Sequence, residues 1–195
     1  MELSQLSIAI NSIYPIDTPL QEAIQKIVKR RVLPKGAVLV TEGQIVDEVH
    51  FIEEGLIRAF YYKGRKEVTS WIAYQGRFIW PLPSYILRQP SRDNIQVLET
   101  ATVLSMNRQD LEELKQRYNV FEDLECRIME RYIVLYDFRV RVLLLKAEER
   151  LEAYQQLFPD LYQRVPLRYI ATYLGIDPAT LSRVRGNYRP KLKAS

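Results

Sequence analysis

The alternation of hydrophobic and polar positions divides the chain into three successive regions. From Leu3 to about Val32, apolar residues recur at helical spacing. From there to about Met106, short β-rich runs alternate with turn residues. From roughly Arg108 to Phe158 the spacing is helical again. The pattern therefore predicts a helical start, a central sheet and a long helical tract.

Glycines and prolines mark the turns of the central region. Five of the seven glycines lie there, and between them stand the runs AVLVT, EVHFIE, LIRAFYY and EVTSWIAY. Two further strands are expected at Ile95–Leu98 and Val103–Met106, after a proline-containing loop from Pro81 to Asp93. Short strands bounded by turns every ~8–12 residues are typical of an antiparallel sandwich or barrel. We therefore predict a compact β-roll.

The stretch from Leu167 to Tyr188 has the layout of a helix-turn-helix, in which two short helices meet across a tight turn. Gly175 suits the left-handed conformation that ends the first helix. Asp177 is placed to cap the second helix, and Pro178 suits its first turn. A small residue, Ala171, lets the helices approach closely. The apolar positions expected to form the shared core are Ile170, Leu174, Leu181 and Val184.

The remaining positions of this stretch carry donors for phosphates and base edges. An ordinary αα-hairpin would use the same spacing for packing alone, but the caps, the turn and the basic positions together favour DNA binding. Arg183 is the leading candidate to read bases. The residues predicted to contact DNA are Arg168, Tyr169, Thr180, Ser182, Arg183, Arg185 and Arg189.

Apolar residues in the long helical tract repeat every seven positions, which is typical of a coiled-coil seam. The alternative is that this short seam packs on the β-domain. Dimerisation is favoured, because DNA readers of this kind usually pair to bind two half-sites. The predicted dimer interface consists of Ile128, Leu135, Phe138, Val142 and Leu145.

The net charge of +4 is unevenly distributed along the 195 residues. From Leu161 onward, seven basic residues accompany one acid, Asp177, so that segment carries +6 and the remaining 160 residues carry −2. A basic segment in an otherwise slightly acidic chain is typical of proteins that bind a polyanion such as DNA. No apolar run approaches the ~20 residues that cross a bilayer, and the N-terminal sequence lacks signal-peptide features. We expect a cytoplasmic protein without membrane contact.

Cys126 and His50 are the only cysteine and the only histidine. An internal disulfide, an iron–sulfur cluster held by this chain alone and a Cys/His zinc site are therefore excluded. An enzyme of the cupin type would need two or three histidines, and no nucleophile elbow, P-loop or dinucleotide glycine pattern occurs. We predict no catalytic residues, no metal site, no cofactor and no enzymatic activity.

The order of β-roll, long helix and helix-turn-helix resembles the cyclic-AMP receptor protein/fumarate-nitrate regulator (Crp/Fnr) family of transcription factors. The resemblance rests on LPKGAVLVTEGQIVDEVHFIEEGLIRAFY and IATYLGIDPATLSRVRG, and is strongest to short Bacteroidetes-type members. It implies an α+β fold with three parts: a cyclic-nucleotide-binding-like effector domain (1–118), a dimerisation helix (119–149) and a helix-turn-helix domain (150–195). It also implies a homodimer that binds a palindromic operator through the second helix.

Two departures from the family pattern limit that resemblance. Members that bind cyclic nucleotides carry a Gly-Glu pair and an Arg-Ser or Arg-Thr pair, whereas the first segment here reads Gly76-Arg77-Phe78. In the second segment, Asp93 follows Arg92 and adds a negative charge, so we predict no cyclic-AMP binding. Near the start of the recognition helix, Pro178 and Ala179 replace an Arg and a Glu that read bases in the family. The operator should therefore differ from the familiar one.

The region around the former nucleotide site is rich in aromatic residues. Core packing explains such residues most simply, and the alternative is a remodelled pocket for an apolar or aromatic effector. The effector-pocket candidates are Trp71, Tyr74, Phe78, Trp80 and Arg92. The expected partners are double-stranded DNA, a second copy of the chain, an unidentified small-molecule effector and RNA polymerase. The alternative function is a sensing module whose helix-turn-helix contacts only proteins.

Overall fold

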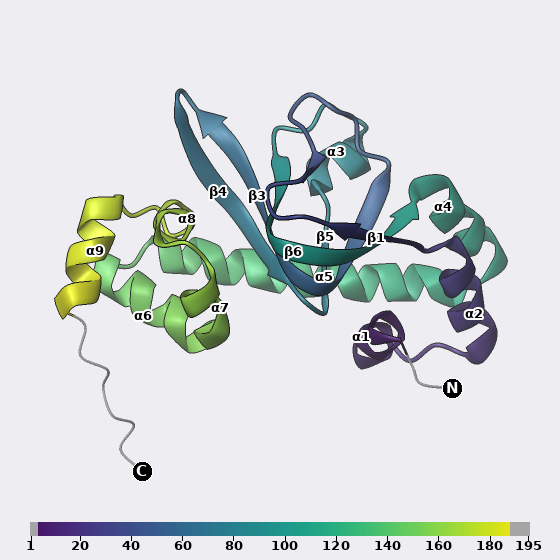
Figure 1. Ribbon diagram of the computed structural model, residues 1–195. Helices are drawn as coiled ribbons and strands as arrows, with labels where there is room; N and C mark the ends of the chain where they lie inside the picture. Colours follow the sequence, from purple (N-terminus) through teal and green to yellow (C-terminus); the bar gives the residue numbers. More distant parts are fainter. Residues whose placement is uncertain (1–3, 188–195) are drawn as a thin grey trace, which may run out of the picture.

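The computed structural model describes residues 4–187, with side chains to residue 184, and has an α+β architecture. A six-stranded antiparallel sheet lies along one side of a long helix, α5 (Val120–Leu143). Helices α1, α2 and α4 pack at one end of α5, and α6 to α9 lie at the other end (Figure 1). No helix in the described part of the chain is long and apolar enough to span a membrane.

Two short helices open the described chain, α1 (Gln5–Ile13) and α2 (Thr18–Ile27). The Asp17 carboxylate accepts a hydrogen bond from Leu20 N at 3.0 Å and so caps α2. The prediction of helix as far as Val32 is wrong, because residues Lys29–Leu33 form strand β1. Pairing with β6 decides this: β1 adds an antiparallel edge strand to the sheet, with Lys29 opposite Ser105.

Two long strands form the centre of the sheet, β3 (Glu48–Lys63) and β6 (Asn94–Asn107). The strand order is β1-β6-β3-β4, with β2 also paired to β6 and β5 to β3. The short strand β5 was not predicted. The remaining strands are β2 (Val38–Val40), β4 (Lys66–Tyr74) and β5 (Arg77–Ile79).

Gly55 explains why two predicted strands are one in the structure. It lies in the middle of β3 with φ of 103°, where the register against β6 shifts. A Cβ at this position would lie 2.7 Å from the Cα of Ala101. Only glycine permits this close approach and this backbone conformation. The strand therefore bends at Gly55 and continues, so EVHFIE and LIRAFYY pair with the same partner strand.

The long helical tract is divided into three helices rather than one. These are α4 (Arg108–Arg117), α5 and α6 (Ala147–Leu157). The chain turns at Tyr118 and again after α5, so the end of α6 packs back toward the sheet. The predicted proline loop contains α3 (Leu82–Leu87). The last three helices are α7 (Pro159–Arg164), α8 (Leu167–Tyr173) and α9 (Pro178–Asn187).

Buried apolar side chains form three clusters that follow this arrangement. One fills the interior of the sheet, around Ile57, Ile95 and Val103. A second joins α1, α2 and α4 to the first half of α5. The third joins α6 to α9 to the end of α5 and to β4, through residues such as Val142 and Ile72. The C-terminal helices are therefore packed on both the long helix and the sheet.

Candidate functional site

Helices α8 and α9 form a compact pair with a buried seam between them. Ala171 is completely buried, and Gly175 ends α8 with φ of 62°. The Asp177 carboxylate accepts a hydrogen bond from Ala179 N at 2.9 Å at the start of α9. Each of these residues has the local role expected from its type. The predicted core positions Ile170, Leu174, Leu181 and Val184 are all buried.

The outer face of α9 is open to solvent. Ser182 and Arg183 are exposed, and Thr180 is half-buried. Helix α9 lies at the outermost end of the molecule, beyond α8 and far from α1 (Figure 1). Neither Ser182 nor Arg183 makes a hydrogen bond or ion pair within the described residues. The side chain of Arg185, and all of Arg189, lie outside the described residues.

The other two predicted DNA contacts are in α8, and they differ from each other. Arg168 is exposed and donates a hydrogen bond to the Tyr169 hydroxyl at 2.7 Å. The ring of Tyr169 lies under the guanidinium of Arg58 in β3, 3.7 Å from its central carbon. Thr172 Oγ1 accepts a hydrogen bond from the backbone N of Thr69 at 3.1 Å. Tyr169 therefore contacts the sheet in this conformation, whereas Arg168 is exposed.

Arg58 is a buried arginine that sequence reasoning missed. It is 1% exposed, and its guanidinium lies between the rings of Tyr169 and Phe60. Its Nη2 donates to Glu67 and to Gln96, while its Nη1 has no partner among the described residues. The signal was an arginine in the middle of an apolar strand run, since charged residues are buried almost only when paired.

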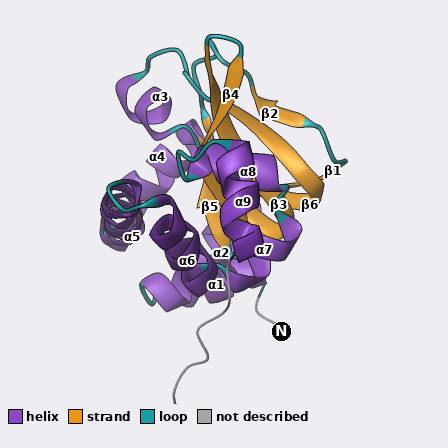
Figure 2. Cartoon of the chain, turned by 90° about the vertical axis from the view of Figure 1, so that its left-hand side faces the viewer, coloured by secondary structure: helices purple, strands orange, loops and turns teal. Residues whose placement is uncertain are grey.

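A second polar link joins the C-terminal helices to the sheet. Arg164 in α7 forms an ion pair with Glu99 in β6 at 2.6 Å, and its Nη1 donates to Gln75 at 3.1 Å. The hydrogen bonds that Arg164 donates to the Glu99 carboxylate raise the pKa of Arg164. Figure 2, turned toward this end of the molecule, shows α8 and α9 in front of the sheet. The α8–α9 pair thus has a defined orientation relative to β3, β4 and β6.

The structure places the predicted dimer seam largely inside the chain. Ile128 packs with α1 and α2, and Phe138 packs with α6 to α9. Val142 is 5% exposed, and Leu135 is half-buried and lines a cavity, so only Leu145 is largely accessible at 40%. The seven-residue repeat of these positions reflects packing within the chain. Their assignment to a dimer interface stays a prediction.

A second heptad pattern lies on the outward side of α5. Ile133 and Val140 are 65% and 57% exposed and occupy equivalent positions of successive heptads. Cys126, also exposed, occupies the same position one heptad earlier. The intervening positions that complete an a/d seam are Met129, Tyr136 and Leu143. At 3.6 residues per turn, Cys126, Ile133 and Val140 point away from the buried side of α5, whereas Met129 lines a pocket and Tyr136 stacks on Trp71 at the flank of this stripe.

Between the sheet, α3 and α5, aromatic side chains fill a narrow recess. Trp71 stacks on Tyr136 with ring centroids 4.9 Å apart, and Trp80 meets Tyr132 edge-on at 5.0 Å. The recess retains a volume of only about 30 Å³. Asp93 lies at its rim and accepts a hydrogen bond from Ser70 Oγ at 2.8 Å. Burial raises the pKa of the Asp93 carboxyl, an effect that the Ser70 hydrogen bond opposes.

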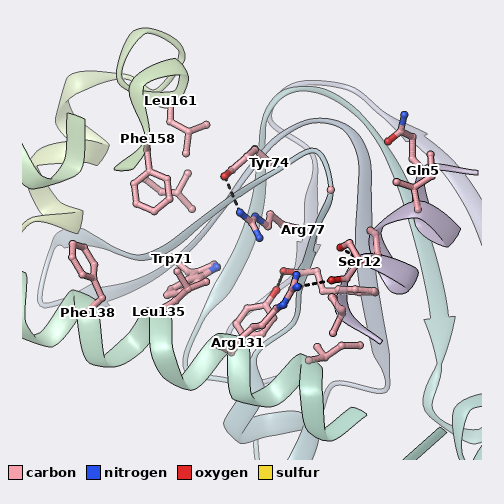
Figure 3. Close-up of a pocket in the computed structure, with 18 of the residues that line it drawn as sticks. Gln5, Ser12, Trp71, Tyr74, Arg77, Arg131, Leu135, Phe138, Phe158 and Leu161 are labelled. Atoms are coloured by element: carbon pink, nitrogen blue, oxygen red, sulfur yellow. Dashed lines mark hydrogen bonds between the residues drawn. The ribbon is translucent and has the colours of Figure 1, made fainter. Parts of the chain in front are cut away.

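A larger cavity of about 260 Å³ lies on the other side of Trp71. Its walls come from α1, from the β4–β5 turn, from α5 and from α6 and α7, so it lies where the three clusters meet (Figure 3). Two arginines, Arg77 and Arg131, line it together with a mostly apolar surface.

Comparisons with known proteins agree with this architecture. Residues 30–118 match the family model of the cyclic nucleotide-binding domain. The sequence matches no curated protein. The catabolite activator protein of Thermus thermophilus is similar in structure, with 18% identity and a TM-score of 0.58 over 91% of this chain and 85% of that one. The c-di-GMP-responsive global regulator CLP of Xanthomonas campestris has 13% identity and a TM-score of 0.69, over 87% and 90%.

A third similar structure is a protein of Eubacterium rectale described as a transcriptional regulator of the Crp/Fnr family. It has 10% identity and a TM-score of 0.68, over 87% of this chain and 82% of that one. The chain has the Crp/Fnr fold. The resemblance inferred from the sequence is thereby confirmed at the level of the fold, and residues 30–118 contain a cyclic nucleotide-binding domain.

Within this Crp/Fnr fold, the predicted effector residues separate into three places. Trp71 lies between the recess and the larger cavity, and Trp80 lines the recess. Tyr74 and Phe78 line the larger cavity. Arg92 is exposed and lines neither space.

The two segments compared with the nucleotide-binding cassette do not meet in the structure. Gly76 lies in the β4–β5 turn and Arg77 begins β5, and both line the larger cavity, not the recess beside α3. Residues Trp80 and Pro81 occupy the position directly before α3, where they face Asp93 across the recess. The residues that surround this recess are therefore aromatic, proline and acidic, rather than glycine, glutamate and arginine.

Proposed function

We propose that the chain is a homodimeric, sequence-specific DNA-binding transcription regulator. The observation that carries the proposal is the division of α9 into two faces. Leu181 and Val184 are buried against the rest of the C-terminal helices, whereas Ser182 and Arg183 are exposed and make no hydrogen bond or ion pair with the described residues. In a helix-turn-helix, the second helix enters the major groove and presents such side chains to base edges. Arg183 then reads bases, with Ser182, Thr180 and Arg168 as further contacts.

Dimerisation in this proposal uses the outward stripe of α5. Ile133 and Val140 are β-branched residues at a positions, the type that favours parallel two-stranded pairing. Parallel pairing of α5 places the two α9 helices on related sides of a two-fold axis, as a palindromic operator requires. We assign residues 1–118 to the effector domain, 119–149 to the dimerisation helix and 150–195 to the DNA-binding domain.

The effector domain in this proposal does not bind cyclic AMP. The recess beside α3 is filled by Trp71, Tyr132 and Tyr136, and Asp93 places a carboxylate at its rim. A cyclic nucleotide would have to displace stacked aromatic rings and approach a like charge, and no arginine of the described chain lines the recess. Each loss costs on the order of 1–3 kcal/mol.

The experiment that tests the proposal is a fluorescence-anisotropy titration of the dimer on genomic DNA fragments, with selection from a random DNA pool to find the operator. A specific reader weakens steeply with salt and retains a preference for one sequence. Binding that is absent at low salt, or equal on all sequences, would overturn the proposal. Capture of a protein partner without DNA binding would instead favour a module that uses α8 and α9 for protein contacts.

A further inference from the structure

The larger cavity differs from the aromatic recess in its place in the fold. Its walls include Ile8 of α1, Trp71 and Phe78 of the sheet, Leu135 of α5 and Phe158 at the end of α6. It therefore touches α1, the β4–β5 hairpin, α5 and the C-terminal helices that carry α9. Its volume of about 260 Å³ is close to the lower end of the ~300–1,000 Å³ typical of small-molecule sites.

The charged side chains that line the cavity are both positive. Arg77 and Arg131 line the cavity, and among the described residues no aspartate or glutamate does. Arg131 donates to the backbone oxygen of Ser12 at 2.7 Å, and Arg77 donates to the Tyr74 hydroxyl at 3.2 Å. Neither guanidinium forms an ion pair within residues 4–184. In Figure 3 both side chains extend toward the middle of the space. An anion at this position would satisfy both charges.

A second, independent feature of the wall is a polar group without a partner. Tyr154 in α6 is 2% exposed and lines the cavity, and its hydroxyl has no hydrogen-bond partner among the described residues. A buried hydroxyl that makes no hydrogen bond is unfavourable. The remaining wall is apolar and rich in aromatic rings. The site thus offers two cations, one free hydroxyl and a surface suited to an aromatic ring.

We propose that this cavity binds a small aromatic monocarboxylate. The carboxylate contacts the Arg77 and Arg131 guanidinium groups, and the ring packs among Trp71, Leu135 and Phe158. A polar atom on the ligand body pairs with the Tyr154 hydroxyl. Because the ligand contacts α1, the sheet, α5 and α6 together, its binding favours the arrangement in which these elements enclose the cavity. This regulatory consequence rests on the proposed function, whereas ligand binding itself does not.

Calorimetric titration of the full-length protein with 3-phenylpropionate and indole-3-acetate tests the binding, with the corresponding neutral amides as matched controls. We expect the carboxylates to bind at least about ten-fold more tightly than the amides, because the hydrogen bonds from arginine are charge-assisted. The double variant Arg77→Gln/Arg131→Gln should reduce this preference to less than about three-fold. The single variant Arg77→Gln, at an exposed position at the start of β5, provides the same test without disturbing the contact between Arg131 and α1.

Leu135→Trp should block the cavity and abolish binding, whereas Val134→Trp, on the neighbouring exposed position, should not. Equal affinity for acids and amides, or no binding of either carboxylate at millimolar concentration, overturns the proposal. The regulatory consequence is measured separately, as a change in anisotropy-detected DNA affinity at saturating ligand. Ligand binding without any DNA binding would contradict the proposed function alone, and DNA binding without carboxylate discrimination would contradict this inference alone.

Discussion

The central guanidinium carbon of Arg58 lies 3.7 Å from the centroid of the Tyr169 ring, and this contact joins the sheet to α8. On its other side the same guanidinium lies 4.0 Å from the Phe60 ring centroid. A cation between two desolvated rings is held more strongly than at an exposed site, where such a contact contributes about 0.5–1 kcal/mol. The orientation of the α8–α9 pair therefore depends in part on one buried arginine.

Arg58→Ala should loosen α8 from the sheet. It removes the contact with Tyr169 and leaves Gln96 without its donor, so we expect a loss of about 1–3 kcal/mol in the free energy of unfolding. Amide hydrogen exchange in α8 should become faster than in β6. Arg65→Ala, at an exposed position of the same hairpin, is the control. Unchanged exchange of α8 in the Arg58 variant would contradict the role assigned to this contact.

Arg183→Ala should weaken operator binding by roughly 1–3 kcal/mol and relax specificity at one base position, because a base-reading arginine is lost. The measurement is anisotropy on the selected operator and on random DNA of the same length. Arg141→Ala, an exposed arginine of α5 that pairs with Asp137, is the matched control. An equal loss on both DNAs would assign Arg183 to a phosphate instead.

Ile133→Glu should convert the dimer to a monomer, because it places two carboxylates opposite each other in the proposed seam. Val134→Glu should leave the dimer intact. The two wild-type side chains are almost equally exposed, at 65% and 66%, but Val134 points away from the Cys126–Ile133–Val140 stripe. Sedimentation velocity distinguishes the two results. Oxidative cross-linking through Cys126 provides a second readout, since parallel in-register helices place the two thiols opposite each other.

His50 should make stability fall as the pH is lowered. Burial, assisted by the nearby Arg31 charge, lowers the pKa of His50 to about 3, and its Nδ1 lies 2.9 Å from Ser105 Oγ. The unfolded chain binds a proton near pH 6.5 and the folded chain does not. His50 therefore does not lower the free energy of unfolding above pH 6.5. Between pH 6.5 and about pH 3 it lowers that free energy by at most ~1.4 kcal/mol per pH unit. Urea unfolding of His50→Gln should lack this part of the slope.

Cyclic AMP should give no binding heat at micromolar concentrations in calorimetry of the purified dimer. The stacked rings of Trp71 and Tyr136 fill the recess, and the Asp93 carboxylate at its rim repels the phosphate of the nucleotide. The Asp93→Ser variant, which removes the like charge, is a useful comparison, and it should remain unable to bind while the rings fill the space. Micromolar affinity in the wild type would contradict this prediction.

The sequence correctly predicted those features that depend only on residues a few positions apart in the chain. Gly175, Asp177 and the apolar positions of α8 and α9 were correctly placed, because caps and helical periodicity act over a few residues. The strand identity of Lys29–Leu33 was missed, since it depends on pairing with β6, more than sixty residues away in the chain.

The spacing of apolar residues also did not show which side of α5 packs against the rest of the chain. Two heptad patterns coexist on the helix, and periodicity alone does not distinguish a stripe that packs on α1 and α6 from one that faces solvent. Similarly, the sequence singled out the aromatic residues, but whether each one lines the narrow recess or the larger cavity depends on where α5 and α6 lie. Arg58 was missed because its partners come from three separate strands and α8.

The ion pair between Arg164 and Glu99 affects how strongly the proposed operator affinity depends on ionic strength. A basic residue that stays bound to its own sheet neutralises no phosphate and releases no counterion from DNA. The logarithmic slope of operator affinity against salt falls by ~0.9 for each phosphate contact that is missing. Salt also weakens the partly exposed Arg164–Glu99 pair itself. In the proposed complex with an operator, the steepness of that slope therefore reports how firmly the C-terminal helices remain docked on the sheet.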